Sequence, residues 1–569
     1  MEKIYRILLG IFLVCLIPIL LVLSYWSCRY SYYGTVDYSI RNLLIKDSTW
    51  KHFVIFLLTS VLVYEGDKWL NAQNQEKQEK ICIYTLLATS VTAFLLGSIY
   101  VLNNPYYPVG DQISATAFAA YCRDGNFIML CSGGYVGMYQ QQKGLGILYE
   151  ILFALFGNFN YTPAKILHVI WWVLAILAGY GFLKLNTDRA IFRIVYCIMM
   201  LGCIPFLLYL PYIYGDVLSI SFGMVMFWAV SAYEHYEKKR YIALAACVAG
   251  IAVLARKNTW IILIGVGIYA VLVCLKKKKG QYLLAGFAIL LTAALTVKAV
   301  DVMYEYRSGY PSDIGIPSIL WIAMGLQETD GMAGVYNRYQ QTTFAEHDFQ
   351  QEPAAQEGKE YIRERLREFR ENPAMARDFF KRKLEDQWIE PLFSSLKATE
   401  SFDTDGEPLS SGITSLYYGN IHETVWKLAN YYQSIVYLAG LVLGIALCGR
   451  WWQKKEIPTA LWLPLIGIVG GFLFSIIWEA QSRYVFPYYV FLILFVPMGL
   501  YETGRAISRL PKHRRKQPNR TRHRKKAYER SPDAFLAAFS CLFRMRSSSK
   551  KVFSIWLHSV SRMPRVTFT

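Results

Sequence analysis

Hydrophobic residues in this chain are gathered into long continuous runs, which polar and charged residues separate. A helix that crosses a membrane needs roughly 20 predominantly apolar residues. Runs of about that length lie at 5–25, 81–102, 162–183, 190–210, 215–233, 259–275, 281–300, 428–449, 457–476 and 485–501. Shorter or more polar candidates lie at 52–65 and 241–255. The pattern predicts an all-α polytopic membrane protein with about 12 transmembrane helices.

One further apolar segment, 144–157, does not fit a regular alternation between the two sides of the membrane. It has only about 14 residues, a length more typical of re-entrant or interfacial segments than of a full span. We therefore expect it to be re-entrant or interfacial.

Basic residues near the ends of the runs set the expected orientation, because Lys and Arg are enriched in short cytoplasmic loops. They occur near the N-terminus, at 67–80, 234–240, 276–279 and 450–456, and throughout the C-terminal tail. Both termini are therefore expected in the cytoplasm. The outer segments are then 26–51, 103–143, 211–216, 256–258, 301–427 and 479–484. Residues 7–25 are too long for the apolar part of a signal peptide and lack a cleavage site, so they are expected to remain as the first span.

The composition agrees with a membrane protein and excludes a soluble one, since 54% of the 569 residues are hydrophobic. The net charge of +19 comes mainly from residues 505–569, where 18 Lys and Arg accompany two acidic residues, so that only +3 belongs to 1–504. A basic tail next to a membrane favours contact with anionic lipid over binding to nucleic acid, and no nucleic-acid partner is expected. Residues 531–569 have a mixed apolar and basic pattern that fits an interfacial helix.

The cysteines indicate neither a metal centre nor a disulfide framework. The 11 residues are scattered, without a CxxC pair or a Cys/His cluster of metal-ligand spacing. Most lie inside expected spans, where Cys behaves as a small hydrophobic residue. Cys122 and Cys131 share one outer loop, where a disulfide and two free thiols are both compatible with the sequence.

The runs and loops divide the chain into six parts. These are three N-terminal spans at 1–102, an outer loop at 103–143, a bundle at 144–300, an outer insertion at 301–427, C-terminal spans at 428–504 and a basic cytoplasmic tail at 505–569. The insertion contains amphipathic helices, broken at Pro373, and is expected to cap the membrane part of the protein. We find no internal repeat, which argues against an inverted-repeat transporter.

The outer loop at 103–143 has features of an active-site loop. Pro105 and Pro108 stop the preceding helix, because proline cannot continue it. Asp111 then follows where the chain leaves the expected bilayer. Glycines at 133–134 and 144–146 let the backbone approach a ligand closely.

Charged residues at the outer ends of the spans are candidates for chemistry, since charges beside a bilayer are costly and are often functional. An outer carboxylate can act as a general base on an acceptor hydroxyl or amine, and outer cations can bind the phosphate of a lipid-linked substrate. The carboxylates are Asp111 and Asp216, the cations are Lys143, Arg256, Lys257 and Arg483, and the supporting residues are Gln112, Gln142 and Glu479.

Each candidate also has a structural interpretation. Both aspartates are suitable helix N-caps. The cations at 256–258 are placed to extend toward lipid headgroups. Glu479 and Arg483 are spaced for a pair across one helical turn. His168 is interpreted as a hydrogen-bonded helix residue, and the excess of Tyr and Trp fits aromatic belts before a sugar-stacking site.

Four stretches carry a resemblance to a known superfamily: PVGDQISATAFA with GGYVGMYQQQKGLGILYEILFALFG, then LPYIYGDVLS, LARKN and EAQSRYVFPYYVFLI. Together they resemble the GT-C superfamily of integral-membrane glycosyltransferases, in particular bacterial relatives of the protein O-mannosyltransferase and aminoarabinose transferase families. The likeness covers roughly residues 80–500 in layout. It implies a GT-C-like fold with a large first catalytic outer loop and a smaller extracytoplasmic helical insertion.

The resemblance also implies a polyprenyl-phosphate sugar donor and inversion at the anomeric carbon. The catalytic acid of the first outer loop would be Asp111, with Asp216 as an assisting second acid. Arg256 and Arg483 match positions that hold the lipid phosphate. This chain departs from the superfamily in having Asp111-Gln112 instead of an Asp-Glu pair, and in placing the loop after the third span. Some members use a divalent metal, which stays compatible with this sequence, although no ligand cluster here requires a cofactor.

The sequence therefore predicts an integral-membrane glycosyltransferase that moves a sugar from a polyprenyl-phosphate donor to a cell-envelope glycan, lipid or protein. The resemblance implies the plasma membrane of a bacterium. A transporter or flippase, and a lipid-linked polysaccharide polymerase, are the alternatives. A transporter is expected to place charges near the middle of the bilayer at broken helices. Here the candidate charges gather at one face, which favours the enzyme.

Overall fold

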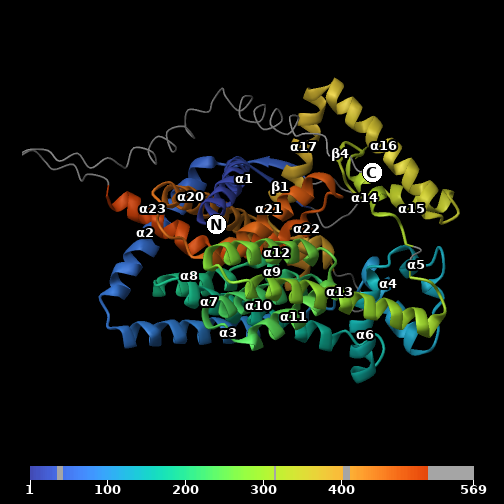
Figure 1. The fold of residues 1–569 in the computed structure, drawn as a ribbon, viewed down its shortest axis with the longest axis horizontal. Helices are drawn as coiled ribbons and strands as arrows, with labels where there is room; N and C mark the ends of the chain where they lie inside the picture. The colour runs from blue at the N-terminus through green and yellow to red at the C-terminus, as the bar shows by residue number, and fades with distance from the viewer. Residues whose placement is uncertain (35–42, 313–314, 401–409, 510–569) are drawn as a thin grey trace, which may run out of the picture. The chain divides into compact units, whose positions relative to one another are not determined.

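The protein is described by a computed structural model, in which residues 1–34, 43–312, 315–400 and 410–509 can be followed (Figure 1). They belong to one compact unit, Met1–Leu510. A second unit, Pro511–Thr569, lies outside the described residues, and with it most of the basic tail and the expected interfacial helix at 531–569.

The N-terminal part consists of three long helices and a short hairpin. Its elements are α1 (Glu2–Arg29), β1 (Tyr30–Tyr33), β2 (Leu43–Lys46), α2 (Thr49–Asn71) and α3 (Gln75–Asn103). The two strands pair antiparallel. The side chain of Asn74 caps α3 by accepting a hydrogen bond from the backbone N–H of Lys77 at 2.8 Å. The helix ends at Asn103, so the prediction that prolines 105 and 108 stop it agrees with the structure.

The loop after α3 and the central bundle are also helical. The loop and the segment after it contain α4 (Asp111–Arg123), η1 (Ile128–Leu130), α5 (Tyr135–Met138) and α6 (Gln142–Phe156). The bundle contains α7 (Thr162–Asn186), α8 (Ala190–Leu201), α9 (Ile204–Leu208), α10 (Asp216–Tyr236), α11 (Lys239–Ala255), α12 (Thr259–Lys277) and α13 (Gln281–Ser308). In this bundle α10 packs between α7 and α11, and α13 packs against α11 (Figure 1).

The insertion is mostly helical, and the C-terminal helices follow it. The insertion contains α14 (Ser318–Gly325), β3 (Glu328–Thr329), β4 (Met332–Ala333), α15 (Tyr339–Glu346), α16 (Gln351–Glu371), α17 (Pro373–Trp388), α18 (Ser395–Ala398) and α19 (Ser411–Tyr418). The last helices are α20 (Asn420–Trp452), η2 (Thr459–Leu461), α21 (Trp462–Ile477), α22 (Ser482–Ile493) and α23 (Val496–Ser508). As predicted, the amphipathic helices of the insertion are interrupted at Pro373, where the Asn372 side chain caps α17.

Within the described ranges, eight helical segments are long and apolar enough to cross a membrane. They are α1, α3, α7, α10, α12, α13, α20 and the segment Thr459–Ile477. The pair α22 and α23, bent by 54°, makes a ninth if it is counted as one span. A helical, multi-pass membrane protein is confirmed, with the hairpins β1–β2 and β3–β4 as short exceptions. The count of 12 spans stays a prediction.

Two expected spans are not continuous helices. The run 190–210 divides into α8 and α9, because helix geometry stops at Gly202 and restarts beside Pro205. The run 485–501 bends between α22 and α23, where Pro497 occupies the first turn of α23. Helix α6 has 15 residues, shorter than any candidate span, in agreement with the expectation that 144–157 does not cross by itself.

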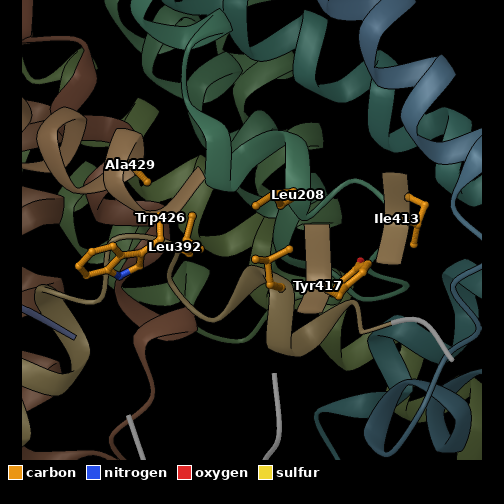
Figure 2. Packing of buried hydrophobic residues seen from close by; sticks show 7 residues of the cluster. Leu208, Leu392, Ile413, Tyr417, Trp426 and Ala429 are labelled. Carbon is orange, nitrogen blue, oxygen red and sulfur yellow. The ribbon is translucent and has the colours of Figure 1, made fainter. Parts of the chain in front are cut away.

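The insertion packs onto the helical bundle through a cluster of buried side chains (Figure 2). Leu208 of α9 lies among Leu392, Leu396 and Ile413, and the rings of Tyr417 and Trp426 complete the cluster with Ala429. Burying one leucine side chain contributes about 1.5–3 kcal/mol. The insertion is therefore packed firmly against the bundle, so its side chains can form a site together with those of the bundle.

Candidate functional site

A cavity of about 1100 Å³ lies where five separate segments of the chain meet. Its lining comes from the loop that contains α4 and α5, from the turn before α10, from the turn between α11 and α12, from the insertion, and from the turn between α21 and α22. These are five of the segments that the charge pattern assigns to the outer side. The structure thus brings most of the predicted site residues to one cavity, which is large enough for a small-molecule substrate.

Asp111 lies at the cavity as an exposed carboxylate on the first residue of α4. The N-cap of this helix is Gly110, whose φ of +58° suits glycine, so the interpretation of Asp111 as the N-cap is wrong. The Asp111 carboxylate instead accepts a hydrogen bond from the Tyr135 hydroxyl at 3.0 Å. A negative charge in the first turn is also favoured by the helix dipole.

The backbone before Asp111 is held by a residue that the sequence reasoning missed. The ammonium group of Lys165, on α7, donates hydrogen bonds to the carbonyl oxygens of Asn104 at 3.2 Å and Tyr106 at 2.8 Å. Gln112 donates to the Tyr106 hydroxyl, and so extends the same network to the residue next to Asp111. The sequence feature that could have pointed to Lys165 is the presence of a lysine close to the start of an apolar run.

Asp216 does not line the large cavity. It is buried, and its carboxylate pairs with the Arg256 guanidinium at 3.2 Å, beside a small separate cavity of about 20 Å³. The N-cap of α10 is Gly215, so the N-cap interpretation is wrong here as well. The position of Asp216 therefore favours a role in holding Arg256, rather than contact with a substrate in the large cavity.

The cations Arg256, Lys257 and Arg483 all line the large cavity. The Arg256 guanidinium lies 4.9 Å from the centre of the Tyr214 ring, and that of Arg483 lies 5.4 Å from it. Such cation–π contacts help to orient a guanidinium, and guanidinium N–H groups are strong hydrogen-bond donors to anions.

Glu479 and Arg483 do not pair across a helical turn, because α22 begins only at Ser482 and Gln481 before it is extended. Arg483 donates instead to the Gln481 side chain at 3.1 Å. Glu479 is buried at the wall of the cavity and accepts a hydrogen bond from the Tyr484 hydroxyl at 3.3 Å. Burial, followed by the charge of Asp111, raises the pKa of Glu479 to about 7.

The turn that contains Glu479 is fixed by the insertion. The backbone N–H of Ala480 donates to the carbonyl of Gly334 at 2.7 Å. Lys383 of α17 is fully buried and donates to the carbonyl of Gly325, and burial lowers the pKa of Lys383 to about 7. A Cβ on Gly334, where φ is +72°, would lie 2.6 Å from the Gly325 oxygen, so only glycine fits there. Sequence reasoning missed this contact, since nothing in the local sequence relates 325–334 to 480.

Two other predicted residues have different surroundings. Gln142 lines the cavity and donates to the Tyr214 hydroxyl. Lys143 is not among the lining residues, and its ammonium group lies 3.6 Å from Asp301 and 3.1 Å from the Ser312 hydroxyl. Lys143 thus connects α6 to α13, and a role in binding the donor phosphate is not supported by its position.

The structure also describes other side chains that the sequence analysis singled out. The His168 ring lies 2.9 Å from the carbonyl of Leu210, as expected for a hydrogen-bonded helix residue. Cys122 and Cys131 are both free thiols. Within 1–34, 43–312, 315–400 and 410–509, no group of three or more His, Cys, Asp or Glu side chains is arranged to hold a metal ion.

Comparisons with known proteins identify a family. A family model described as "Conserved hypothetical integral membrane protein" matches residues 173–503. This range is more than half of the chain, so the protein belongs to that family. The matched range includes Arg256, Glu479 and Arg483, but it begins after Asp111 and so does not include that residue. No curated protein matches the chain. No solved structure matches it either.

Proposed function

We propose that this member of the integral membrane family is a GT-C type glycosyltransferase that uses a polyprenyl-phosphate-linked sugar donor. The acceptor is a cell-envelope glycan, lipid or protein on the extracytoplasmic face of a bacterial plasma membrane, with both termini of the enzyme in the cytoplasm. The observation that carries the proposal is the cavity itself, which combines the exposed Asp111 carboxylate with the guanidinium groups of Arg256 and Arg483. That combination suits transfer of a group away from a phosphate.

The cations account for binding of the donor and for departure of its phosphate. Arg256 and Arg483 present N–H donors to phosphate oxygens, and Lys257 adds a positive charge. When the bond between the anomeric carbon and the phosphate oxygen breaks, the phosphate leaves with the electron pair and gains negative charge. Fixed guanidinium groups stabilise that charge without reorganising. Asp216 supports this role by its ion pair with Arg256.

Asp111 is the general base of the proposed reaction. Its carboxylate removes the proton of the acceptor hydroxyl while the acceptor oxygen attacks the anomeric carbon from the side opposite the phosphate. The new glycosidic bond therefore has inverted configuration. The Tyr135 hydroxyl, 3.0 Å from the Asp111 carboxylate, fixes its orientation.

Glu479 replaces Asp216 as the second acid of the cavity in this proposal. Two ionised carboxylates beside a phosphate would repel one another and the donor. The burial of Glu479 and the charge of Asp111 favour its neutral form near neutral pH. A neutral carboxyl group can donate a hydrogen bond to the phosphate or to the sugar.

The test is sugar transfer in membranes that contain the protein, with a radiolabelled sugar on polyprenyl phosphate. Asp111→Asn is compared with Asp124→Asn, which changes an exposed aspartate at the other end of α4. We expect Asp111→Asn to lower the rate by at least about 100-fold while Asp124→Asn retains it. Equal rates in the two variants would remove Asp111 from the mechanism.

The same preparation separates the alternatives. If the wild type transfers no sugar but moves labelled lipid across vesicle membranes, the protein is a flippase or transporter. Extension of a lipid-linked glycan by repeated units would instead identify a polymerase. Addition of a chelator during the assay shows whether a divalent metal takes part.

A further inference from the structure

The lining of the cavity differs chemically from one part to another. Charged side chains line the cavity from α4, from the turn between α11 and α12, and from the segment that runs from Glu479 to Arg483 in the first turn of α22. The insertion adds the charged residues Asp386 of α17 and Lys397 of α18. A different part is formed by residues 138–142 of the loop and by residues 312–351 of the insertion. Among the described residues of these two segments, those that line the cavity are all uncharged.

Glutamine side chains dominate the polar groups of this uncharged part. Gln140, Gln340 and Gln351 all line the cavity; Gln140 lies between α5 and α6, Gln340 on α15 and Gln351 on α16. Gln351 donates to the carbonyl of Gly315 at 2.6 Å, and a Cβ on Gly315 would lie 2.5 Å from the Cγ of Gln140. Gln140 and Gln351 are therefore neighbours on either side of Gly315.

Some of these amide groups lack partners within the described residues. Gln340 is 1% exposed, and neither its oxygen nor its nitrogen has a hydrogen-bond partner there. The side-chain oxygen of Gln140 has none either, although its nitrogen donates to the carbonyl of Gly137 at 2.7 Å. A buried polar atom without a partner destabilises the folded protein. At the wall of a cavity, such groups are arranged for a partner that enters from outside.

Aromatic rings lie next to the glutamines. The rings of Tyr139 and Trp321 are 6.1 Å apart at 68°, and Trp321 stacks on Trp478 at 6.0 Å and 7°. All three line the cavity and are only partly buried. The backbone hydrogen bond from Ile316 to Met138, at 3.0 Å, holds the insertion against the loop at this place.

We propose that the glutamine wall, defined as Gln140, Gln340 and Gln351 with the rings of Tyr139 and Trp321, binds an uncharged, hydroxyl-rich carbohydrate. This inference rests on the proposed function, within which the carbohydrate is the acceptor. The enzyme would then extend a glycan rather than modify a protein or a lipid phosphate.

The chemistry of the wall matches a sugar more closely than the other classes of acceptor. A side-chain amide offers two donors and an acceptor, and sugar hydroxyls both donate and accept. The faces of Tyr and Trp rings bury the apolar C–H faces of a sugar ring. An acidic or basic peptide would need opposite charges here, and a hydrocarbon chain would leave the amides without partners.

The experiment measures carbohydrate binding in the absence of any donor. The purified full-length protein in detergent is titrated with labelled linear gluco- and manno-oligosaccharides, and in a second arm with vesicles that contain a glycolipid of the same glycan. Gln340→Met keeps the side-chain volume and removes the amide. Gln356→Met is the matched control, since Gln356 is exposed on α16 and does not line the cavity. Gln140→Met serves if Gln340→Met does not fold.

We expect Gln340→Met and Trp321→Leu each to weaken oligosaccharide binding by about tenfold or more, and Gln356→Met to leave it unchanged. Binding only in the vesicle arm would identify a lipid-linked glycan. Absence of oligosaccharide binding in both arms, equal affinities in Gln340→Met and Gln356→Met, or preferential binding of a neutral peptide would overturn the proposal.

The two proposals fail in different ways. If oligosaccharide binding depends on Gln340 but no sugar transfer is observed, the glutamine wall stands and the transferase proposal falls. If transfer depends on Asp111 but glycan binding does not depend on Gln340, the transferase stands and the glutamine wall falls.

Discussion

The protonation of Glu479 gives a measurable link between pH and stability. Burial and the charge of Asp111 raise the pKa of Glu479 from its ordinary value of 4.5 to about 7. A shift of that size corresponds to about 3 kcal/mol. Because the folded pKa is above the unfolded one, the advantage of the neutral group is complete below pH 4.5 and is lost as the pH rises through about 7. Glu479→Gln removes this titration and keeps the shape of the side chain.

The assay is thermal unfolding of the purified protein in detergent, followed by tryptophan fluorescence at one heating rate, at pH values from about 5 to about 9. We expect the midpoint of the wild type to fall as the pH rises, and that of Glu479→Gln to fall by less. Lys383, Glu385 and Glu390 also have pKa values near 7, and they titrate in both proteins. The difference between the two proteins is therefore the relevant quantity.

Asp111→Asn provides a second check on the same reasoning. Removing the Asp111 charge lowers the pKa of Glu479, so the fall in the midpoint ends at a lower pH and is smaller than in the wild type. Identical pH dependence in the wild type and in Glu479→Gln would refute the assignment of a neutral, buried carboxyl group at this position.

Three further predictions concern the framework of the site. Gly334→Ala places a Cβ 2.6 Å from a backbone oxygen at a φ of +72°, and we expect it to cost about 2–4 kcal/mol and to lower the thermal midpoint. Gly412→Ala is the control, because a Cβ there meets nothing within 4 Å and should not lower the midpoint. Equal midpoints in the two variants would contradict the close contact at Gly334. Arg256→Met leaves the Asp216 carboxylate buried without its ion pair, and we expect it to lower the stability by about 3–5 kcal/mol. The double variant Arg256→Met with Asp216→Asn should recover most of this loss. A double variant no more stable than Arg256→Met would show that the pair is not coupled. Lys165→Met removes two hydrogen bonds to the backbone before α4. We expect chymotrypsin to cleave that segment faster while the rate of global unfolding is unchanged. An unchanged cleavage rate would show that Lys165 does not hold the loop.

The sequence alone determined the class of the protein and the segments that form the cavity. Long apolar runs have few stable forms other than helices in a membrane, so the helices follow from composition and run length. Charges at the ends of such runs are costly unless they lie in water or in a site. For this reason Asp111, Arg256, Lys257, Glu479 and Arg483 could be selected before the structure, and all five line the cavity.

Only the tertiary structure decided which of these groups meet each other. Asp216 and Arg256 are 40 positions apart, and their pairing, which removes Asp216 from the large cavity, depends on the packing of α10 beside α11. The prolines in the two broken runs are visible in the sequence, but whether a proline bends a helix or ends it depends on the neighbours that pack there.

The insertion shows most clearly that local structure could be predicted from the sequence while contacts between distant segments could not. Its amphipathic helices and their break at Pro373 could be predicted, because amphipathicity is a local periodic signal. Three other features could not be predicted: the hydrogen bond between Gly334 and Ala480, the burial of Lys383, and the amide of Gln340, which has no partner within the described part of the chain. Each depends on two segments far apart in the chain meeting at a short distance. A single sequence records the burial preference of each residue but not its partner, and the partner is what sets the charge, the pKa and the shape of the site.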